Sequence, residues 1–123
     1  MKLNFVHRAA TALSVLFLAS TAQAQTATPQ NHFGWTETGQ TPAAATAATY
    51  KLYEGTTPLG TLTNVTCVAS GADADCTGDI PALIQGTHTV TLTQNSQGAE
   101  SPKSNAVSFT FVIVIVPTSF RVK

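Results

Sequence analysis

Alternation of apolar and hydroxyl side chains constrains the fold of this chain more than any other feature. Residues 87–93 carry threonine at every second position and His, Val or Leu between them. A period of two sends successive side chains to opposite faces of a strand, so one face is apolar and the other polar. Residues 50–53 and 106–111 alternate in the same way. The pattern predicts half-buried strands.

Turn-forming residues divide the rest of the chain into further short segments. Strand candidates are residues 32–37, 59–70 and 75–83, and the last of these ends at an edge because Pro81 cannot donate to a sheet. Residues 38–49 contain Gly39 and Pro42 and predict a loop, with a helix as the alternative because alanine is frequent there. Five or six short strands separated by turns indicate an antiparallel β-sandwich.

The first 24 residues have the pattern of a cleavable secretory signal peptide. Lys2 and Arg8 give a positive start, residues 9–19 are apolar, and residues 22–24 read AQA, a small-residue cleavage site. The apolar run falls short of the roughly 20 residues that cross a bilayer, so we expect no stable membrane insertion. We predict a signal peptide at residues 1–24, one mature domain at 25–123, and a secreted, periplasmic or cell-surface location.

Few charges remain in the predicted mature chain. It keeps four basic and six acidic residues, a net charge of −2. Such a chain lacks the basic field that attracts nucleic acid or anionic lipid. We therefore expect no nucleic-acid partner.

The two cysteines, Cys67 and Cys76, both lie in the mature chain and would meet an oxidising environment after export. Their spacing excludes a CxxC redox motif, and two thiols without a nearby histidine make a poor zinc site. The sequence therefore predicts a disulfide that closes the short segment CVASGADADC.

Three stretches in order, FGWTE, ATYKLYEG and ALIQGTHTVTLTQNSQGAESPKSNAVSFTF, resemble strands B, C, F and G of a bacterial fibronectin type III domain over residues 32–111. The resemblance implies an all-β fold, an immunoglobulin-like antiparallel β-sandwich of the fibronectin type III kind. It also implies that Trp35 packs in the core and that residues 50–53 match a Tyr-x-x-Tyr-like segment of strand C.

Two departures from the family stand out. His88 occupies the place of the conserved corner tyrosine near the start of strand F, where it can still donate one hydrogen bond backwards. Only residues 25–34 precede Trp35 in the mature chain, too few for a full first strand and a full second one. We expect a domain that lacks a full A strand.

Alternation and the resemblance together define a predicted core. Its residues are Trp35, Tyr50, Leu52, His88, Val90, Leu92, Val107 and Phe109.

Several residues resemble chemical sites without completing one. His88 has no Ser or Cys partner in a recognisable motif, so we assign it a structural role and predict no catalytic residues. The acidic segment 73–79 has the spacing of a calcium loop, but its twelfth position is Ile84 instead of glutamate. We interpret this segment as a solvated acidic turn and predict no metal site and no cofactor.

Residues 111–116, FVIVIV, are apolar at every position, although a strand at the edge of a sandwich should have one wet face. An exposed run of uncharged β-formers is also prone to pair with other strands. We expect something to cover it, and we predict that the interaction residues are Phe111, Val112, Val114 and Val116, together with the outward Tyr53.

These observations favour an exported, non-catalytic structural or adhesion module whose partner is another protein or a second copy of itself. Two alternatives stay open at this stage. The chain could be a subunit of a surface assembly joined by β-strand addition, or a carbohydrate-binding accessory domain with a glycan ligand at its aromatic residues.

Overall fold

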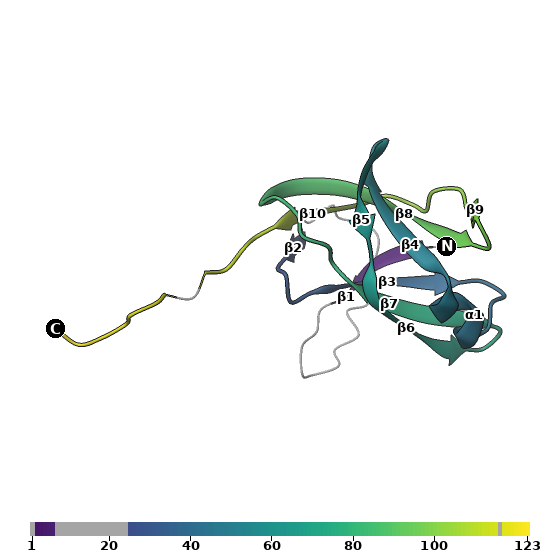
Figure 1. Ribbon diagram of the computed structural model, residues 1–123, viewed down its shortest axis with the longest axis horizontal. Coiled ribbons are helices and arrows are strands. Elements are labelled where there is room, and N and C mark those ends of the chain that lie inside the picture. Colours follow the sequence, from purple (N-terminus) through teal and green to yellow (C-terminus); the bar gives the residue numbers. More distant parts are fainter. Residues whose placement is uncertain (1, 7–24, 116) are drawn as a thin grey trace.

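Two β-sheets face each other in the computed structural model, which describes residues 2–6, 25–115 and 117–123 (Figure 1). In strand order, the first sheet contains β1 (Lys2–Val6), β3 (His32–Glu37), β7 (Asp73–Asp79) and β6 (Thr63–Ser70). The second contains β2 (Gln25–Ala27), β10 (Val107–Phe111), β8 (Gly86–Ser96), β4 (Thr49–Glu54) and β5 (Thr57–Thr61), with β9 (Ala99–Glu100) paired to β8. Neighbouring strands are antiparallel, apart from β2 and β10. The predicted all-β, immunoglobulin-like sandwich is confirmed.

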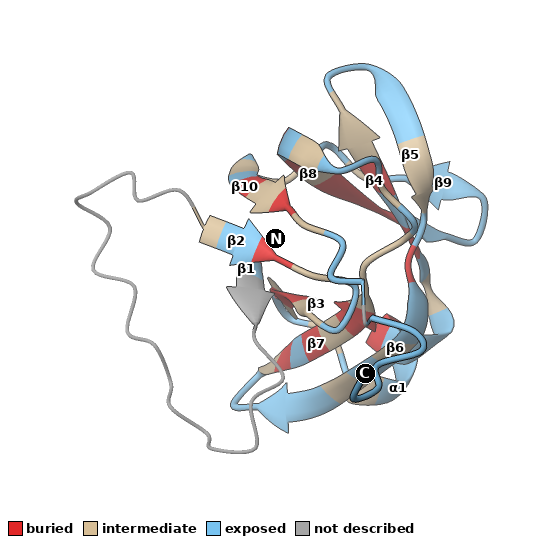
Figure 2. Ribbon diagram, turned by 90° about the vertical axis from the view of Figure 1, so that its left-hand side faces the viewer, coloured by how far each residue is buried: buried red, intermediate tan, exposed pale blue. Residues whose placement is uncertain are grey.

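Aromatic side chains join the two sheets across the core. Trp35 of β3 lies 4.6 Å from Tyr50 of β4 between ring centroids, and Phe33 of β3 meets Phe109 of β10 edge to face at 5.7 Å. Edge-to-face and tilted pairs at such distances are favourable beyond the area that they bury. Figure 2 shows that strands of both sheets carry buried residues, in keeping with a core between the sheets.

The residues that the sequence assigns to the core lie there. All are buried except Val107, which is half-buried. They are joined by Leu3, Ala27, Phe33, Ala45, Leu62, Ala74, Cys76 and Phe111, which the predicted core did not include, although alternation already turned Phe111 inward.

A short helix, α1 (Pro42–Ala47), replaces the predicted loop. Thr41 caps it, because the threonine hydroxyl accepts a hydrogen bond from the backbone N–H of Ala44 at 3.2 Å. Pro42 occupies the first turn, where its missing N–H costs nothing. The loop prediction was wrong and the helix alternative was right, since the cap, the proline and the alanines all favour a helix start.

Two other segments also differ from expectation. The predicted single strand over 59–70 is divided at Leu62 into β5 and β6, which belong to different sheets. The acidic segment is no turn, because residues 73–79 form the regular strand β7 between β3 and β6. Its acids face outward while Ala74, Cys76 and Gly78 are buried, so small inward residues outweigh the low strand propensity of aspartate.

The last strand ends earlier than its sequence suggests. The alternation predicts that the inward series continues from Phe111 through Ile113 and Ile115, yet β10 stops at Phe111. Its partner β8 begins at Gly86, which pairs with Phe111, so no residue of β8 remains to extend the ladder. Strand propensity alone does not hold a strand without a neighbour.

The N-terminal end of the domain is built from two separate segments. Residues 25–27 form the three-residue strand β2 beside β10, and His32 already begins β3. The first-strand position beside β3 is filled by β1, residues 2–6 of the predicted signal peptide. The remainder of that predicted peptide, residues 7–24, lies outside the described residues.

The predicted disulfide is present between Cys67 of β6 and Cys76 of β7, which face each other across the antiparallel ladder. Their Cα atoms are 4.1 Å apart. Cys76 is buried against the core and Cys67 is half-buried, so the bond ties the outer strand β6 to the interior of its sheet.

Removal of this bond should destabilise the domain. We expect the double variant Cys67→Ser, Cys76→Ser to lose about 2 to 3 kcal/mol of unfolding free energy, because the closed segment restricts the unfolded chain. Urea denaturation followed by tryptophan fluorescence measures the loss. The matched control is Ser70→Ala on the same hairpin, and equal stability of the double variant and the wild type would contradict the expectation.

Candidate functional site

The apolar tail segment, which we define as residues 112–115, leaves the sandwich and extends into solvent (Figure 1). Ile113, Val114 and Ile115 are 45%, 70% and 82% exposed, and Val112 is half-buried. Val116 lies outside the described residues. A run of exposed branched aliphatic side chains is unusual on a protein surface and marks a place where other molecules bind.

Two backbone hydrogen bonds direct the start of this segment. The N–H of Val112 donates to the carbonyl oxygen of Ala27 at 2.8 Å, and the N–H of Ile113 donates to Oε1 of Gln85 at 3.2 Å. The chain therefore continues past Phe111 in the direction of β10 before it leaves the body of the domain.

Phe111 does not belong to the exposed group. The sequence placed it among the interaction residues, but its side chain is 2% exposed and packs in the core. It occupies the last position of β10, where alternation turns it inward. Phe111 anchors the tail segment and is not available to a partner.

The outer edge of β3 is the second element of the candidate site. Residues 2–6 pair antiparallel with residues 32–36, and Leu3, which lies opposite Trp35, is only 1% exposed. Asn105 holds the same strand through its amide, which accepts from the N–H of Leu3 at 2.9 Å and donates to the carbonyl of Leu3 at 3.4 Å. The site thus receives an extended strand with an apolar inward side chain.

Sequence reasoning did not identify Asn105. It lies in the connection that precedes β10, where asparagine is ordinarily read as a turn residue. A side-chain amide that bonds to both the N–H and the carbonyl of one residue recognises an extended backbone regardless of side chain. No sequence motif identifies an asparagine with this role.

Tyr53, the predicted outward aromatic, is only partly exposed. Its hydroxyl donates to the carboxylate of Glu100 at 2.6 Å, and Nζ of Lys103 lies 5.0 Å from the ring centroid. The hydrogen bond to Glu100 raises the pKa of Tyr53 and lowers that of Glu100. Because Trp35 and Tyr50 are buried, the three aromatics form no surface platform for a sugar ring.

His88 makes the backward hydrogen bond that a corner tyrosine would make. Its Nε2 donates to the carbonyl oxygen of Ile84 at 2.6 Å, and its Nδ1 lies 3.1 Å from Oε2 of Glu54. The ring also lies 5.8 Å from the ring of Phe109. These contacts give His88 a structural role at the start of β8.

The acidic side chains of β7 are each held by a different protein partner. Asp73 accepts from the N–H of Gly39, Asp75 accepts from the hydroxyl of Thr36, and Asp79 pairs with His32 and Asn64. Spacing along an extended strand separates these carboxylates. Among the described residues no three His, Cys, Asp or Glu side chains gather as metal ligands.

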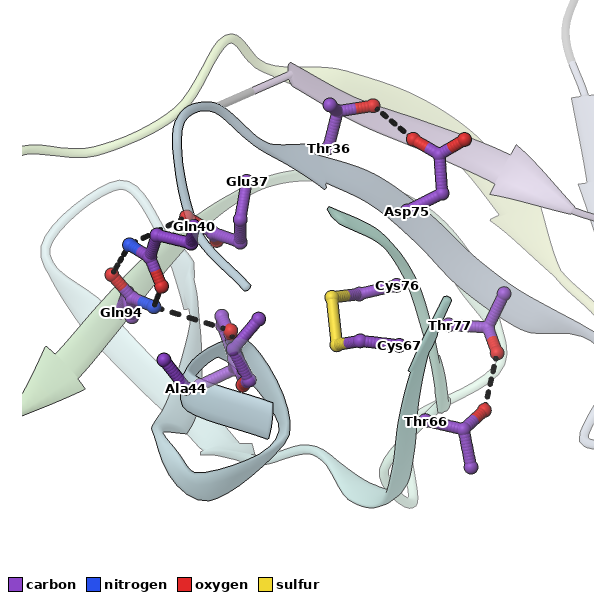
Figure 3. The surroundings of a disulfide bond; sticks show 12 residues. Thr36, Glu37, Gln40, Ala44, Thr66, Cys67, Asp75, Cys76, Thr77 and Gln94 are labelled. Carbon is purple, nitrogen blue, oxygen red and sulfur yellow. Dashed lines mark hydrogen bonds between the residues drawn. A yellow bond between two sulfur atoms is a disulfide. The ribbon is translucent and has the colours of Figure 1, made fainter. Parts of the chain in front are cut away.

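A buried polar cluster lies beside α1 and the disulfide (Figure 3). The side-chain amides of Gln40 and Gln94 bond to each other in both directions at 3.0 and 2.9 Å, and Nε2 of Gln94 also donates to the hydroxyl of Tyr50. That hydroxyl in turn donates to the carbonyl oxygen of Ala45. The cluster joins the two sheets to the helix.

Glu37 borders this cluster and is 5% exposed. Its Oε2 receives a long 3.5 Å hydrogen bond from Gln40, and its Oε1 has no hydrogen-bond partner among the described residues. Burial raises the pKa of this carboxyl above its ordinary value of 4.5. Sequence reasoning did not identify the burial of this residue, because a glutamate at a strand end is usually solvated.

No helix in the described part of the chain is long and apolar enough to cross a membrane. An open depression between α1 and the end of β8 is lined only by small and polar residues, namely Ala44, Ala47, Ala48, Thr49, Asn95, Ser96 and Gln97. Among the described residues, the exposed tail segment is therefore the most distinctive surface feature, and the outer edge of β3 is covered by β1.

No protein-family model matches this chain, and neither a curated protein nor a solved structure matches it. Its candidate site must be judged from its own geometry.

Replacing His88 should destabilise the domain. We expect His88→Ala to lower the unfolding free energy by about 2 kcal/mol, since it removes two hydrogen bonds and the ring packed near Phe109. Urea denaturation measures the change, with the exposed neighbour Thr87→Ala as the control. If the two variants are equally stable, the His88 ring does not stabilise the start of β8.

Replacing Glu37 should stabilise the domain at neutral pH. A raised pKa means that the folded state binds the proton more tightly than the unfolded state. The protonated carboxyl therefore adds to the unfolding free energy in full below pH 4.5, and this stabilisation is lost as the pH rises through the folded pKa. We expect Glu37→Gln to gain about 1 kcal/mol at pH 7, the low end of the cost of an unpaired buried acceptor.

The test is urea denaturation of both proteins between pH 4 and pH 8, where the difference in unfolding free energy should shrink toward the acid end. Glu100→Gln is the control, because the pKa of Glu100 is lowered and its loss should act in the opposite sense. A gain for Glu37→Gln that does not depend on pH would contradict the assignment.

Proposed function

We propose that this protein is an exported, non-catalytic β-sandwich module that acts by binding other protein chains outside the cytoplasm. The observation that carries the proposal is the exposed apolar tail segment, which adjoins the rigid end of β10. Each branched aliphatic side chain that leaves water on binding contributes roughly 1.5 to 3 kcal/mol before ordering costs. Such a segment is better suited to a protein partner than to a small polar ligand.

Export is supported by the signal-peptide pattern of residues 1–24 and by the disulfide. A disulfide persists in an oxidising compartment such as the periplasm or the cell exterior. The resemblance of residues 32–111 to fibronectin type III domains points to the same kind of use, because β-sandwiches of this type commonly serve as structural or adhesion modules. Fold alone does not fix the ligand.

A more specific version of this function is a subunit of a surface assembly joined by β-strand addition. The observation that favours it is the edge of β3, whose backbone groups are paired by a strand from the predicted signal peptide. Removal of that peptide would leave a sheet edge open beside an unpaired apolar segment.

Site-specific photo-crosslinking tests the proposed function. A photoreactive amino acid at position 114 should form adducts with protein in cells that export the chain, and the protein recovered outside the cytoplasm should begin at Gln25. Val68 is the matched control, because it is 65% exposed, close to the 70% of Val114, but lies on β6 away from the tail.

Absence of protein adducts at position 114, or equal adducts at both positions, would overturn the contact function. Recovery of an intact chain from the cytoplasm would overturn export.

A further inference from the structure

We infer that β1 occupies a docking groove in the uncleaved chain and that, after removal of residues 1–24, the apolar tail segment of a second copy enters this groove as an antiparallel strand. The inference deepens the proposed function by naming the groove, its occupant and the event that opens it. The groove consists of the outer edge of β3, the gap left by Leu3 and the amide of Asn105.

The groove accepts an extended strand that has an apolar inward side chain. β1 is an extended strand whose Leu3 side chain is buried in the core opposite Trp35. Both hydrogen bonds between Asn105 and that strand go to backbone atoms of Leu3, and such bonds place no demand on the incoming sequence. Any extended strand with an apolar inward residue meets these two requirements, since a sheet edge binds through its backbone and selects by alternate side chains.

The tail segment meets both requirements of the groove, an extended strand and an apolar inward residue, in every register. Val112, Ile113, Val114 and Ile115 are all apolar, so either alternate set can supply the inward side chain. β-branched residues also favour the extended conformation that the edge requires. In a strand with one polar face, a one-residue slip would turn polar side chains toward the core. The same slip in residues 112–115 would still turn apolar side chains inward.

The direction of β1 along the groove favours the tail of a second copy over the chain's own tail. β1 runs from Leu3, which is bonded to Asn105 just before β10, to Val6, which pairs with His32. β2 leads through the turn at residues 28–31 into His32, and Ala27 pairs with Phe111. The tail therefore leaves the domain at the Val6 end of the groove.

To lie antiparallel to β3, as β1 does, the chain's own tail would first have to travel back along the whole groove. That path of five residues, about 17 Å, would use up the apolar residues and leave the segment PTSFRVK for the groove. Pro117 cannot donate to the ladder. A sharp reversal at Phe111 would instead break the hydrogen bonds of Val112 and Ile113 that direct the chain outward.

A second copy has neither restriction. Its tail, Val112 to Lys123, can approach from the Asn105 end and spans up to about 40 Å when extended. Reciprocal exchange gives a closed dimer, whereas one-way donation gives a head-to-tail chain.

The test uses the full chain with a specific protease site inserted between Ala24 and Gln25. The protein is purified folded, cut, and separated from residues 1–24, and its mass is followed by sedimentation over a range of concentrations. We expect the cut protein to associate. The synthetic peptide KLNFV, the sequence of β1, should compete for the groove and return it to the monomer.

Variants of the cut protein separate strand pairing from apolar clustering. The adjacent pair Val114→Pro, Ile115→Pro keeps apolar side chains but removes a ladder donor in either register, and it should weaken association about tenfold. The adjacent pair Ile113→Lys, Val114→Lys blocks both registers and should do the same. Phe120→Lys with Val122→Lys changes apolar residues that lie farther along the tail and are more exposed than Ile113 and Val114, and it should leave association unchanged.

Asn105→Ala reports on the groove itself. It should weaken association of the cut protein, because the amide would no longer bond to the backbone of the incoming strand.

A monomeric cut protein would overturn the inference, as would association that survives the pair Val114→Pro, Ile115→Pro or that the peptide KLNFV does not reduce. Should a variant fail to fold after cutting, restoration of its near-ultraviolet circular dichroism by KLNFV would support the groove, and failure of the peptide to restore it would count against the groove.

These outcomes are distinct from those of the proposed function. Adducts at position 114 that contain only a different protein would retain the contact function and reject self-association. Because the sedimentation assay uses purified chains, its result does not depend on whether a cell exports the protein.

Discussion

The contact between Trp35 and Tyr50 is the interaction on which the rest of this structure depends. It joins the middle of β3 to the start of β4 and so fixes how the two sheets face each other. Tyr50 also bonds to the carbonyl of Ala45, so the same ring sets the position of α1. An aromatic side chain combines a large buried area with a polar end, which allows one residue to order both a core and a helix. The amide pair of Gln40 and Gln94 completes this arrangement without leaving the tyrosine hydroxyl unpaired.

Sequence periodicity predicts the strands that have one wet face and one dry face. β4, β8 and β10 alternate clearly, because each has a polar face as well as a buried one. The disulfide follows from cysteine number and compartment. These features depend on local pattern, so they can be read without knowledge of the fold.

Other features depend on which neighbour a strand finds, and the sequence does not show neighbours. Residues 73–79 fit both an acidic turn and the start of the strand predicted over 75–83, and only the neighbours β3 and β6 decide for the strand. Residues 111–116 look like one strand, but β8 is too short to pair beyond Phe111. The role of Asn105 and the burial of Glu37 arise from tertiary packing and have no local signature. The helix α1 was within reach of sequence reasoning, since Thr41 and Pro42 form an ordinary helix start.

The parallel pairing of β2 with β10 gives the molecule a polarity. It places the beginning of the predicted mature chain and the origin of the tail at the same end of the sandwich. The β8 to β9 hairpin, whose turn is formed by Gln97 and Gly98, is separated in sequence from both. Affinity tags or fluorescent proteins fused at either terminus would therefore crowd the edge where contacts are made. A reporter inserted between Gln97 and Gly98 would follow the end of β8 opposite Gly86, which pairs with Phe111, and would therefore lie away from the origin of the tail. Exposed hairpin tips also tolerate insertion well.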